Sequence, residues 1–433
     1  MTLRYEAFSH CGRAGLVVFL FLFVAGCGSK AAKSTPPASN GDKSTCKPAS
    51  YTAATPYKYT TPSVLHPAAV TTAAGSLGTV TVDIPVSSVG IGIVIEGTNT
   101  NLKLIEHGIL MSPSTQCMRG PAGVVPFAFN QMDVDENGSI DDEPGSLVNY
   151  QAPALFFPND GRQLTLPAGT YTFPVGSVDA SDNLDSDTLT PTVFYMTPAA
   201  SQTTPTALTV NVWMVAGVNP SVDGAADPLA AMRADPELQG AVGNLVASYQ
   251  SDPNIGVTLT VNHGYVADSA LAILDSYAEM DALIQGYPVP PADNAINLFV
   301  VSAIGTPGAP SPIYPSGTIG FALGVPGPFN RQGTIVSGVL AEYQGDGTGA
   351  TLGAILSHEL GHYLGLYHTT QTSTNQNSFV GYDPIQDTPV CKTLPLSACP
   401  DVANLMFPID MGQPSLSVTV EQGRVLRLNP VMQ

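Results

Sequence analysis

The chain contains, from His358 to His368, the sequence HELGHYLGLYH, which has the pattern H-E-x-x-H-x-x-G-x-x-H. On a helix, residues four apart lie on one face, so His358 and His362 can bind the same metal ion. Gly365 can adopt the left-handed conformation that ends a helix, and the turn then brings His368 round as a third ligand. Three neutral imidazoles leave one position of a tetrahedral zinc ion open, as in a catalytic site. The stretch therefore predicts a catalytic zinc centre.

Glu359 stands beside the first ligand, where its carboxylate can serve as a general base. One alternative is an apolar helix with incidental histidines. The chain has only 7 histidines, and three of them fall in this pattern, which makes coincidence the weaker explanation. A purely structural zinc site is the other alternative. It is disfavoured because such a site needs no carboxylate next to an open position.

Length and composition limit the classes of protein to which the chain can belong. Its 433 residues predict two or three domains, and its 44% hydrophobic content is ample for their cores. Acidic residues number 34 and basic residues 15, which gives a net charge of −19. Nucleic acids and anionic membrane surfaces both require basic surface, so we expect neither as a partner.

Residues 1–26 have the features of an export signal. The apolar run Leu16–Val24 follows two arginines and is short for a membrane-spanning helix, which is the alternative. The sequence Val24-Ala25-Gly26-Cys27 resembles the bacterial lipobox, and this resemblance implies cleavage before Cys27 and lipidation of Cys27. Because Gly28 rather than Asp follows the cysteine, we expect a lipoprotein of the outer membrane or cell surface.

Residues 27–61 are rich in Ser, Thr, Pro, Ala and Lys and lack apolar periodicity, which is typical of a flexible tether. Residues 62–200 contain short alternating segments between Gly, Pro and Asn turns, which predicts a β-sandwich serving as an accessory domain or pro-domain. We expect a first strand with Val80, Val82, Ile84 and Val86 on one face. The other predicted strands are Gly90–Ile95, Leu102–Met111, Ala154–Phe157, Gln163–Leu166 and Thr192–Met196.

The stretch that begins at Asp133 resembles the first nine positions of an EF-hand calcium loop. Its candidate ligands are Asp133, Asp135, Asn137 and Asp141, whose oxygens suit a hard cation. The twelfth position, which should be a bidentate Glu, is Pro144. A Ca²⁺ site is therefore one hypothesis, and an ordinary solvated turn is the other.

Residues 201–433 change to alternating strands and helices. Leu208, Val210, Val212 and Met214 alternate along a predicted strand, and Ala295–Val301 is apolar except for Asn297, which predicts a central strand. We also expect a helix after Asp235-Pro236, a strand through Val257, Leu259 and Val261, a helix over Ser269–Gln285, strands over Thr318–Leu323 and Thr334–Leu340, and the helix that carries His358. One of the last two strands could form an edge beside the active site.

The His358–His368 pattern resembles the metzincin metallopeptidases, and its continuation Leu366-Tyr367-His368-Thr369 is similar to the pappalysin (cytophagalysin) family. Similar positions follow in order at Asp387-Thr388-Pro389, at Cys391 and Cys399, and at Asn404-Leu405-Met406. This resemblance covers roughly residues 206–433, by the same motif criteria.

The resemblance implies a zincin-like catalytic domain, a mixed twisted sheet with helices. It also implies a disulfide between Cys391 and Cys399, and a Met-turn in which Met406 underlies the three ligand imidazoles. Some metzincins carry a Tyr two residues after that Met, where it can reach the zinc. Pro408 holds this place here, so no such role is carried over.

Two further cysteines, Cys46 and Cys117, remain in the mature chain. In an oxidising compartment a second disulfide is the default expectation. The alternative is that Cys117 blocks the zinc as a latency thiolate in a pro-segment.

These features predict a lipid-anchored, zinc-dependent endopeptidase outside the cytoplasm, acting on protein or peptide substrates. Glu359 would take a proton from water and deliver it to the leaving amine. The alternative function is a surface binding or adhesion lipoprotein that uses an inactive zinc-peptidase scaffold. A zinc hydrolase of a non-protein substrate is a third hypothesis.

Overall fold

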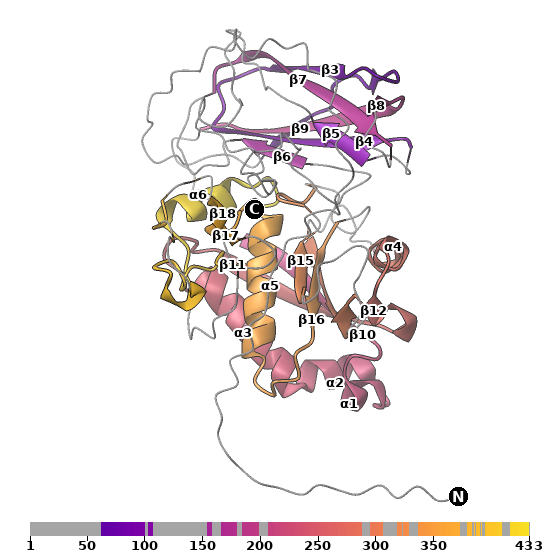
Figure 1. Ribbon diagram of the computed structural model, residues 1–433, viewed down its shortest axis with the longest axis vertical. Coiled ribbons are helices and arrows are strands. Elements are labelled where there is room, and N and C mark those ends of the chain that lie inside the picture. Colours follow the sequence, from indigo (N-terminus) through magenta and orange to yellow (C-terminus); the bar gives the residue numbers. More distant parts are fainter. Residues whose placement is uncertain are drawn as a thin grey trace, which may run out of the picture.

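The computed structural model consists of a β-sandwich and a mixed α/β unit that lies beneath it in Figure 1. The structure describes residues 62–99, 103–106, 154–157, 166–179, 184–198, 207–287, 295–305, 318–322, 324–328, 337–372, 379–382, 385, 387–389, 391, 395–408 and 416–432. The predicted export signal, tether and lipidation site Cys27 lie outside these residues. So do Cys46, Cys117 and the predicted calcium loop from Asp133 to Asp141.

The first unit consists of two antiparallel sheets, in agreement with the β structure predicted for this region. One sheet has the order β1-β9-β4-β6, with β2 also paired to β9, and the other has the order β3-β7-β5, with β8 paired to β7. The strands are β1 (Ser63–Leu65), β2 (Val70–Thr71), β3 (Gly78–Ile84), β4 (Gly90–Gly97), β5 (Lys103–Glu106), β6 (Ala154–Phe157), β7 (Gly169–Val178), β8 (Leu184–Asp185) and β9 (Thr188–Met196).

Alternating apolar residues build the core between these sheets. Val80, Val82 and Ile84 of β3 are buried there, as the sequence predicted. Val86 was expected on the same face but is 45% exposed, because β3 ends at Ile84. The next residue is Pro85, which has no backbone N–H to extend the ladder.

Strands β4 and β9 are buried on both faces. Ile93 of β4 and Val193 of β9 point into the sandwich, whereas Val94 and Phe194 belong to the core of the second unit. That second core also contains Met432, near the end of the chain. The outer face of this sheet is therefore covered by the α/β unit, which explains its near-continuous apolar sequence.

The second unit has a five-stranded sheet of order β11-β10-β13-β16-β15, in which only β15 is antiparallel to its neighbour. This mixed sheet with helices agrees with the predicted fold class. The elements are β10 (Ala207–Val215), α1 (Pro220–Asp223), α2 (Pro228–Ala234), α3 (Pro236–Gln250), β11 (Thr258–Val266), η2 (Ser269–Leu271), β12 (Ile273–Leu274), α4 (Tyr277–Gly286), β13 (Ala295–Val301), β14 (Ala303–Ile304), β15 (Gly320–Ala322), β16 (Val339–Glu342), α5 (Ala350–Tyr363), β17 (Thr370–Thr372), β18 (Phe379–Tyr382), η3 (Leu396–Ala398) and α6 (Val420–Leu428).

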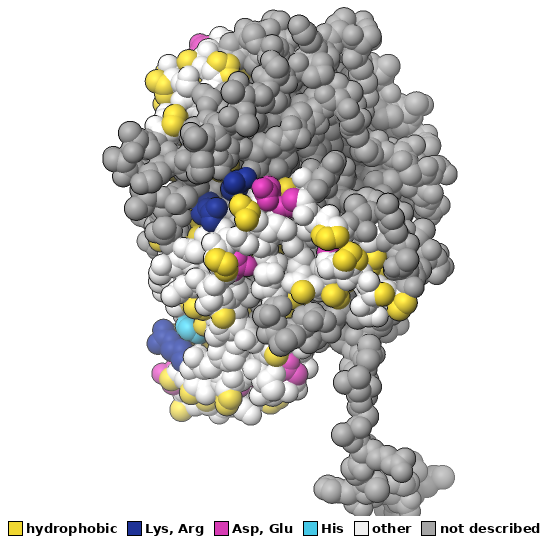
Figure 2. Space-filling model, turned by 90° about the vertical axis from the view of Figure 1, so that its left-hand side faces the viewer, with side chains coloured by type: hydrophobic (Ala, Val, Ile, Leu, Met, Phe, Trp, Pro, Cys, Tyr) yellow, Lys and Arg dark blue, Asp and Glu magenta, His cyan; other side chains and the backbone are white. Residues whose placement is uncertain are grey.

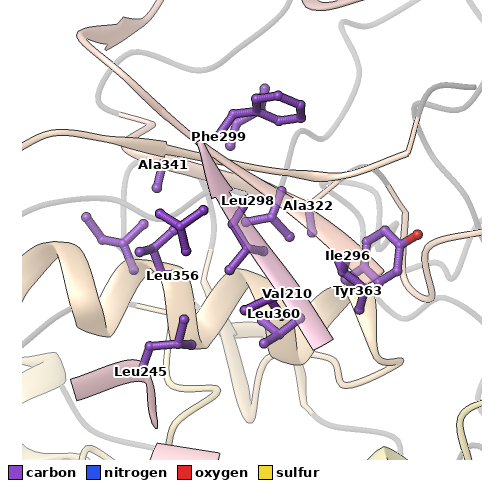
Figure 3. Packing of buried hydrophobic residues seen from close by; sticks show 14 of the residues in the cluster. Val210, Leu245, Ile296, Leu298, Phe299, Ala322, Ala341, Leu356, Leu360 and Tyr363 are labelled. Carbon is purple, nitrogen blue, oxygen red and sulfur yellow. The ribbon is translucent and has the colours of Figure 1, made fainter. Parts of the chain in front are cut away.

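The core of this unit lies between the sheet and helices α3 and α5. Every residue of β13 is buried, which confirms its predicted central position. Figure 3 shows Leu356 and Leu360 of α5 directed toward Val210 and Leu298 of the sheet, while Phe299 lies on the opposite face of β13. The sheet thus supports the helix on which two of the predicted metal ligands lie.

The prediction of one helix over Ser269–Gln285 was wrong in its first half. These residues form the short helix η2 and strand β12, and helix α4 begins only at Tyr277. A capping box sets this start, because the Ser276 side chain accepts from the Glu279 N–H while the Glu279 carboxylate accepts from the Ser276 N–H.

Figure 2 shows one face of the molecule, on which scattered apolar side chains and a few charged ones lie among other side chains and backbone. Among the helices that the structure describes, none combines the length and the apolar character that a membrane crossing requires.

Candidate metal centre

Helix α5 carries His358, Glu359 and His362, and Asp346 bonds the backbone around its first residues. The Asp346 carboxylate accepts hydrogen bonds from the backbone N–H groups of Thr348 and Thr351, among others. Burial alone would raise the pKa of Asp346, but these hydrogen bonds lower it to about 2. An ionised carboxylate at this end also interacts favourably with the helix dipole.

The end of α5 has the geometry that the sequence predicted. Gly365 has a φ of 106°, in the left-handed region that favours glycine. Its N–H donates to the carbonyl of His362 at 2.8 Å, and the N–H of Leu366 donates to the carbonyl of Gly361 at 2.9 Å. This pair of bonds is a Schellman motif, and it reverses the chain so that His368 returns toward the helix.

The three predicted ligand histidines meet in one buried cluster. His358, His362 and His368 are 3%, 1% and 2% exposed. The Nε2 atom of His368 lies 3.1 Å from the Nε2 atom of His358 and 3.1 Å from that of His362. The structure therefore contains a buried three-histidine group that could hold a metal ion.

Backbone carbonyls fix the proton on two of these rings. The Nδ1–H of His358 donates to Leu405 O, and the Nδ1–H of His362 donates to Leu366 O, both at 2.7 Å. A carbonyl can only accept, so each neutral ring presents a bare Nε2 lone pair to the cluster. His368 can donate to only one of them.

A bound cation would accept the Nε2 lone pairs of all three rings. Without one, a single Nε2–H of His368 can bond only one of the other two rings. Tetrahedral zinc with Zn–N distances of about 2.0–2.1 Å separates its ligand nitrogens by roughly 3.3 Å. The observed separations of 3.1 Å are close to this value. The donor set therefore fits zinc.

The surroundings keep the imidazoles neutral, which is the form that binds metal. Burial, followed by the charge of His368, lowers the pKa of His358 to about 3, against a raising contribution from its bond to Leu405. Burial, then His368 and His358, lower the pKa of His362 well below its usual value.

Glu359 is 3% exposed and lies against the edge strand β15. Burial raises its pKa to about 8, and a hydrogen bond from the Ala322 backbone opposes this shift. A Cβ built on Gly320 would lie 2.5 Å from Oε1 of Glu359, so the strand backbone directly adjoins the carboxylate. A cation at the histidines would favour the ionised form and lower the pKa of Glu359.

Met406 is fully buried against the helix that carries the first two histidines. A Cβ on Gly361 would lie 2.6 Å from Met406 Sδ, so glycine at this position lets the sulfur approach the helix backbone. The neighbouring carbonyls contact both ligand segments, since Leu405 O accepts from His358, and Met406 O accepts from the N–H of Thr369 at 3.0 Å.

The disulfide between Cys391 and Cys399, which the family resemblance implied, is present. It packs with Leu396 and Phe407 in a small separate core. The neighbouring Asp401 is buried, and its carboxylate accepts from the hydroxyls of Thr369 and Thr370 at 2.7 and 2.8 Å. These bonds tie the segment after His368 to the disulfide loop.

Sequence reasoning missed the close approaches made by Gly320 and Gly361 and the role of the Leu405 carbonyl. Gly361 carried a usable signal, because glycine in a helix interior is unfavourable and requires a packing reason. Gly320 carried none, since its neighbour Glu359 is 39 positions away. Backbone carbonyls carry no sequence signal at all.

No family model matches the chain, and no curated protein matches it in sequence. Among solved structures, a chaperone–substrate complex is similar over 60% of this chain and 37% of its own, at 12% identity and a TM-score of 0.29. Metalloproteinase-II from Bacteroides fragilis is similar over 58% of this chain and 64% of its own, at 13% identity and a TM-score of 0.29. The chain thus spans less than two thirds of either structure.

Proposed function

We propose that the protein is a zinc-dependent endopeptidase in which Glu359 is the general base. One observation carries this proposal: three buried imidazoles bring their Nε2 atoms together, and the buried Glu359 follows the first of them on the same helix. A site kept only for structure has no use for that carboxylate.

Each residue of the site has a distinct part in the proposed reaction. His358, His362 and His368 would hold zinc, which supplies Lewis acidity and lowers the pKa of a water molecule in its open position. Glu359 would accept a proton from that water and deliver it to the leaving amine. Glu359 must be ionised to act as a base, and a cation bound at the histidines would favour this form at neutral pH.

The edge strand β15 supports an extended peptide as the substrate. Among the described strands, β15 ends the sheet and pairs with β16 alone. An extended peptide can bind such an edge as an additional strand through backbone hydrogen bonds. Because Gly320 and Ala322 of β15 adjoin Glu359, a peptide bound there would pass the base.

The segment after β15 is fastened to the end of α5. The Gly327 N–H donates to the carbonyl of Tyr363 at 2.9 Å, and the Tyr367 hydroxyl donates to the carbonyl of Val325 at 3.1 Å. These bonds hold the segment that follows the edge strand against the end of the helix, which favours a fixed distance between a bound peptide and Glu359.

We further propose that the protein is exported and anchored through lipidated Cys27. The support is the signal-like sequence of residues 1–26, together with the Cys391–Cys399 disulfide, which is typical of oxidising compartments. Labelling with a fatty-acid analogue tests the anchor, with Cys27→Ser as the matched control. Label that persists in Cys27→Ser would exclude this anchor.

A peptide-library digest with and without a zinc chelator tests the main proposal. We expect cleavage that the chelator abolishes and that added Zn²⁺ restores. Zinc binding without cleavage of any peptide would instead favour an inactive scaffold or a non-protein substrate. Cleavage that is insensitive to chelation would exclude the proposed chemistry.

A further inference from the structure

Two side-chain amides form a reciprocal pair. One belongs to residues 404–406, the predicted Met-turn, and the other to the C-terminal helix α6. The Nδ2 of Asn404 donates to Oε1 of Gln422 at 2.8 Å, and the Nε2 of Gln422 donates to Oδ1 of Asn404 at 3.3 Å. Gln422 is fully buried. The pair joins positions 18 residues apart in the sequence.

Backbone donors fix the orientation of both amides. The N–H of Met406 donates to Oδ1 of Asn404 at 2.8 Å, and the N–H of Thr419 donates to Oε1 of Gln422 at 2.9 Å. Rotating either amide would set an NH₂ group against a backbone N–H. The backbone donors therefore hold both amides in the orientation that forms this pair.

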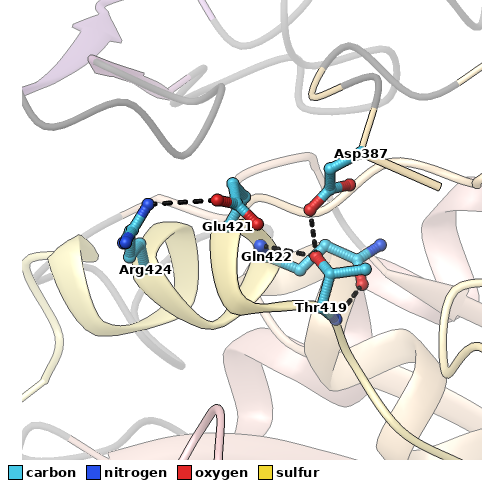
Figure 4. Close-up of polar contacts among 5 residues, drawn as sticks. All are labelled: Asp387, Thr419, Glu421, Gln422 and Arg424. Atoms are coloured by element: carbon cyan, nitrogen blue, oxygen red, sulfur yellow. Dashed lines mark hydrogen bonds and ion pairs between the residues drawn. The ribbon is translucent and has the colours of Figure 1, made fainter.

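The start of α6 is itself firmly anchored. Figure 4 shows Gln422 beside Thr419, whose hydroxyl bonds the carboxylate of Asp387. At the preceding Val418, the carbonyl accepts from Nδ2 of Asn254 at 2.8 Å, and the N–H donates to the Asp252 carboxylate at 2.9 Å. Gln422 thus projects from a fixed point of the fold toward the Met-turn.

Residues 404–406 are hydrogen-bonded to the segments that carry two of the three histidines. Leu405 O accepts from the ring of His358, and Met406 O accepts from the backbone of Thr369, the residue after His368. A displacement of residues 404–406 would therefore move the first and third ligands relative to each other. His362, whose ring bonds Leu366 O, is oriented locally.

We propose that Gln422 is a positioning residue of the metal centre, acting through Asn404 and the Leu405 carbonyl on His358. The inference rests on the proposed metal site but not on peptidase activity. The backbone bond from Leu405 N–H to Ser417 O, at 2.8 Å, does not involve Gln422 and remains when its side chain is removed. Loss of the side chain should thus loosen the ligand geometry while the fold persists.

The first test measures the zinc dissociation constant of the full chain by competition with a chromophoric chelator. Residues that orient metal ligands through hydrogen bonds typically change metal affinity by about 10–100-fold when mutated. We expect Gln422→Ala to weaken zinc binding by about 10-fold. The visible spectrum of the Co²⁺-loaded variant should also shift, because the ligand geometry changes. Gln422→Glu keeps an acceptor for Asn404 and Thr419 but sets a carboxylate oxygen against Oδ1 of Asn404, so it should also bind zinc more weakly than the parent.

Glu421→Gln is the matched control on the same helix. Glu421 pairs at 3.2 Å with Arg424 on the helix surface, so its replacement removes a surface ion pair next to Gln422 without touching the amide pair. We expect the zinc affinity and the Co²⁺ spectrum of this variant to match those of the parent.

A double-mutant cycle keeps the inference testable even where Gln422→Ala lowers stability. If Gln422 acts through Asn404, the Asn404→Ala/Gln422→Ala chain should bind zinc no more weakly than Asn404→Ala alone. Additive losses, or a Gln422→Ala chain with parental affinity and spectrum, would overturn the inference and leave the proposed function intact. A parent chain that binds no zinc would overturn both.

Discussion

Gly320 on β15 faces Glu359 on α5 so closely that a Cβ added to the glycine would lie 2.5 Å from the carboxylate oxygen Oε1. The same Cβ would lie 2.7 Å from Cγ2 of Ile355, so the helix surface leaves no room for it on either side. The edge strand and the proposed base are therefore fixed against each other by a residue without a side chain.

Gly320→Ala should lower kcat/KM by about 10²-fold, because a 1 Å misplacement of a catalytic group can have that effect. Zinc content, measured by elemental analysis, should stay at the parent level, since the histidines are not displaced. Gly243→Ala is the matched control: a Cβ there meets nothing within 4 Å. Parental activity in Gly320→Ala would show that the contact does not constrain the base.

Glu359→Ala should retain zinc while losing nearly all hydrolysis. Removal of a general base typically lowers the rate by about 10²–10⁴-fold. Zinc should stay bound because the rings of His358 and His362 are oriented by backbone carbonyls. Zinc content and kcat/KM on a peptide found by library digestion are the two measurements. A variant that cleaves at the parental rate would disprove the role of Glu359.

The stability of the metal-free protein should depend on pH through Glu359. Burial raises its pKa from 4.5 to about 8, so the folded chain keeps a proton that the unfolded chain releases between these values. The resulting stabilisation is fully present below about pH 4.5 and is lost as the pH rises through about 8. Urea unfolding of the chelated parent and of Glu359→Gln, at a series of pH values, measures this effect.

The quantity to compare is the free energy of unfolding of the parent minus that of Glu359→Gln, because all other titrating groups cancel in this difference. It should fall between about pH 4.5 and 8 without metal. With zinc bound it should change less, because the cation favours the carboxylate. A difference that is constant with pH in the chelated proteins would contradict the prediction.

Gly361→Ala should destabilise the protein even though alanine favours helices. The new methyl would lie 2.6 Å from Met406 Sδ, and overpacking of a filled core typically costs about 1–3 kcal/mol. We expect a lower Tm and weaker zinc binding, because Met406 and the neighbouring Leu405 carbonyl must move. Shortening the opposing side chain in Gly361→Ala/Met406→Ala should recover part of the zinc affinity; if it recovers none, the clash is not the cause.

The ligand set was predictable because its information is local. His358 and His362 are one helical turn apart, and Gly365 supplies the reversal that returns His368, so eleven consecutive residues encode the geometry. Strand β13 was predictable for the same reason, since six of its seven consecutive residues are apolar, with Asn297 the exception, and such a run indicates two-sided burial. The helix over Ser269–Gln285 failed because the capping box at Ser276 outweighed the apolar spacing before it.

The sequence by itself determined the three histidines, the carboxylate beside them and the turn that joins them, since each depends on neighbours along the chain. Only the tertiary structure decided which carbonyl directs each ring and which strand adjoins Glu359. It also decided that the amide of Gln422 meets that of Asn404. Such contacts join backbone and side-chain atoms from distant segments, and a linear pattern does not encode them because their partners are set by how helices and sheet pack.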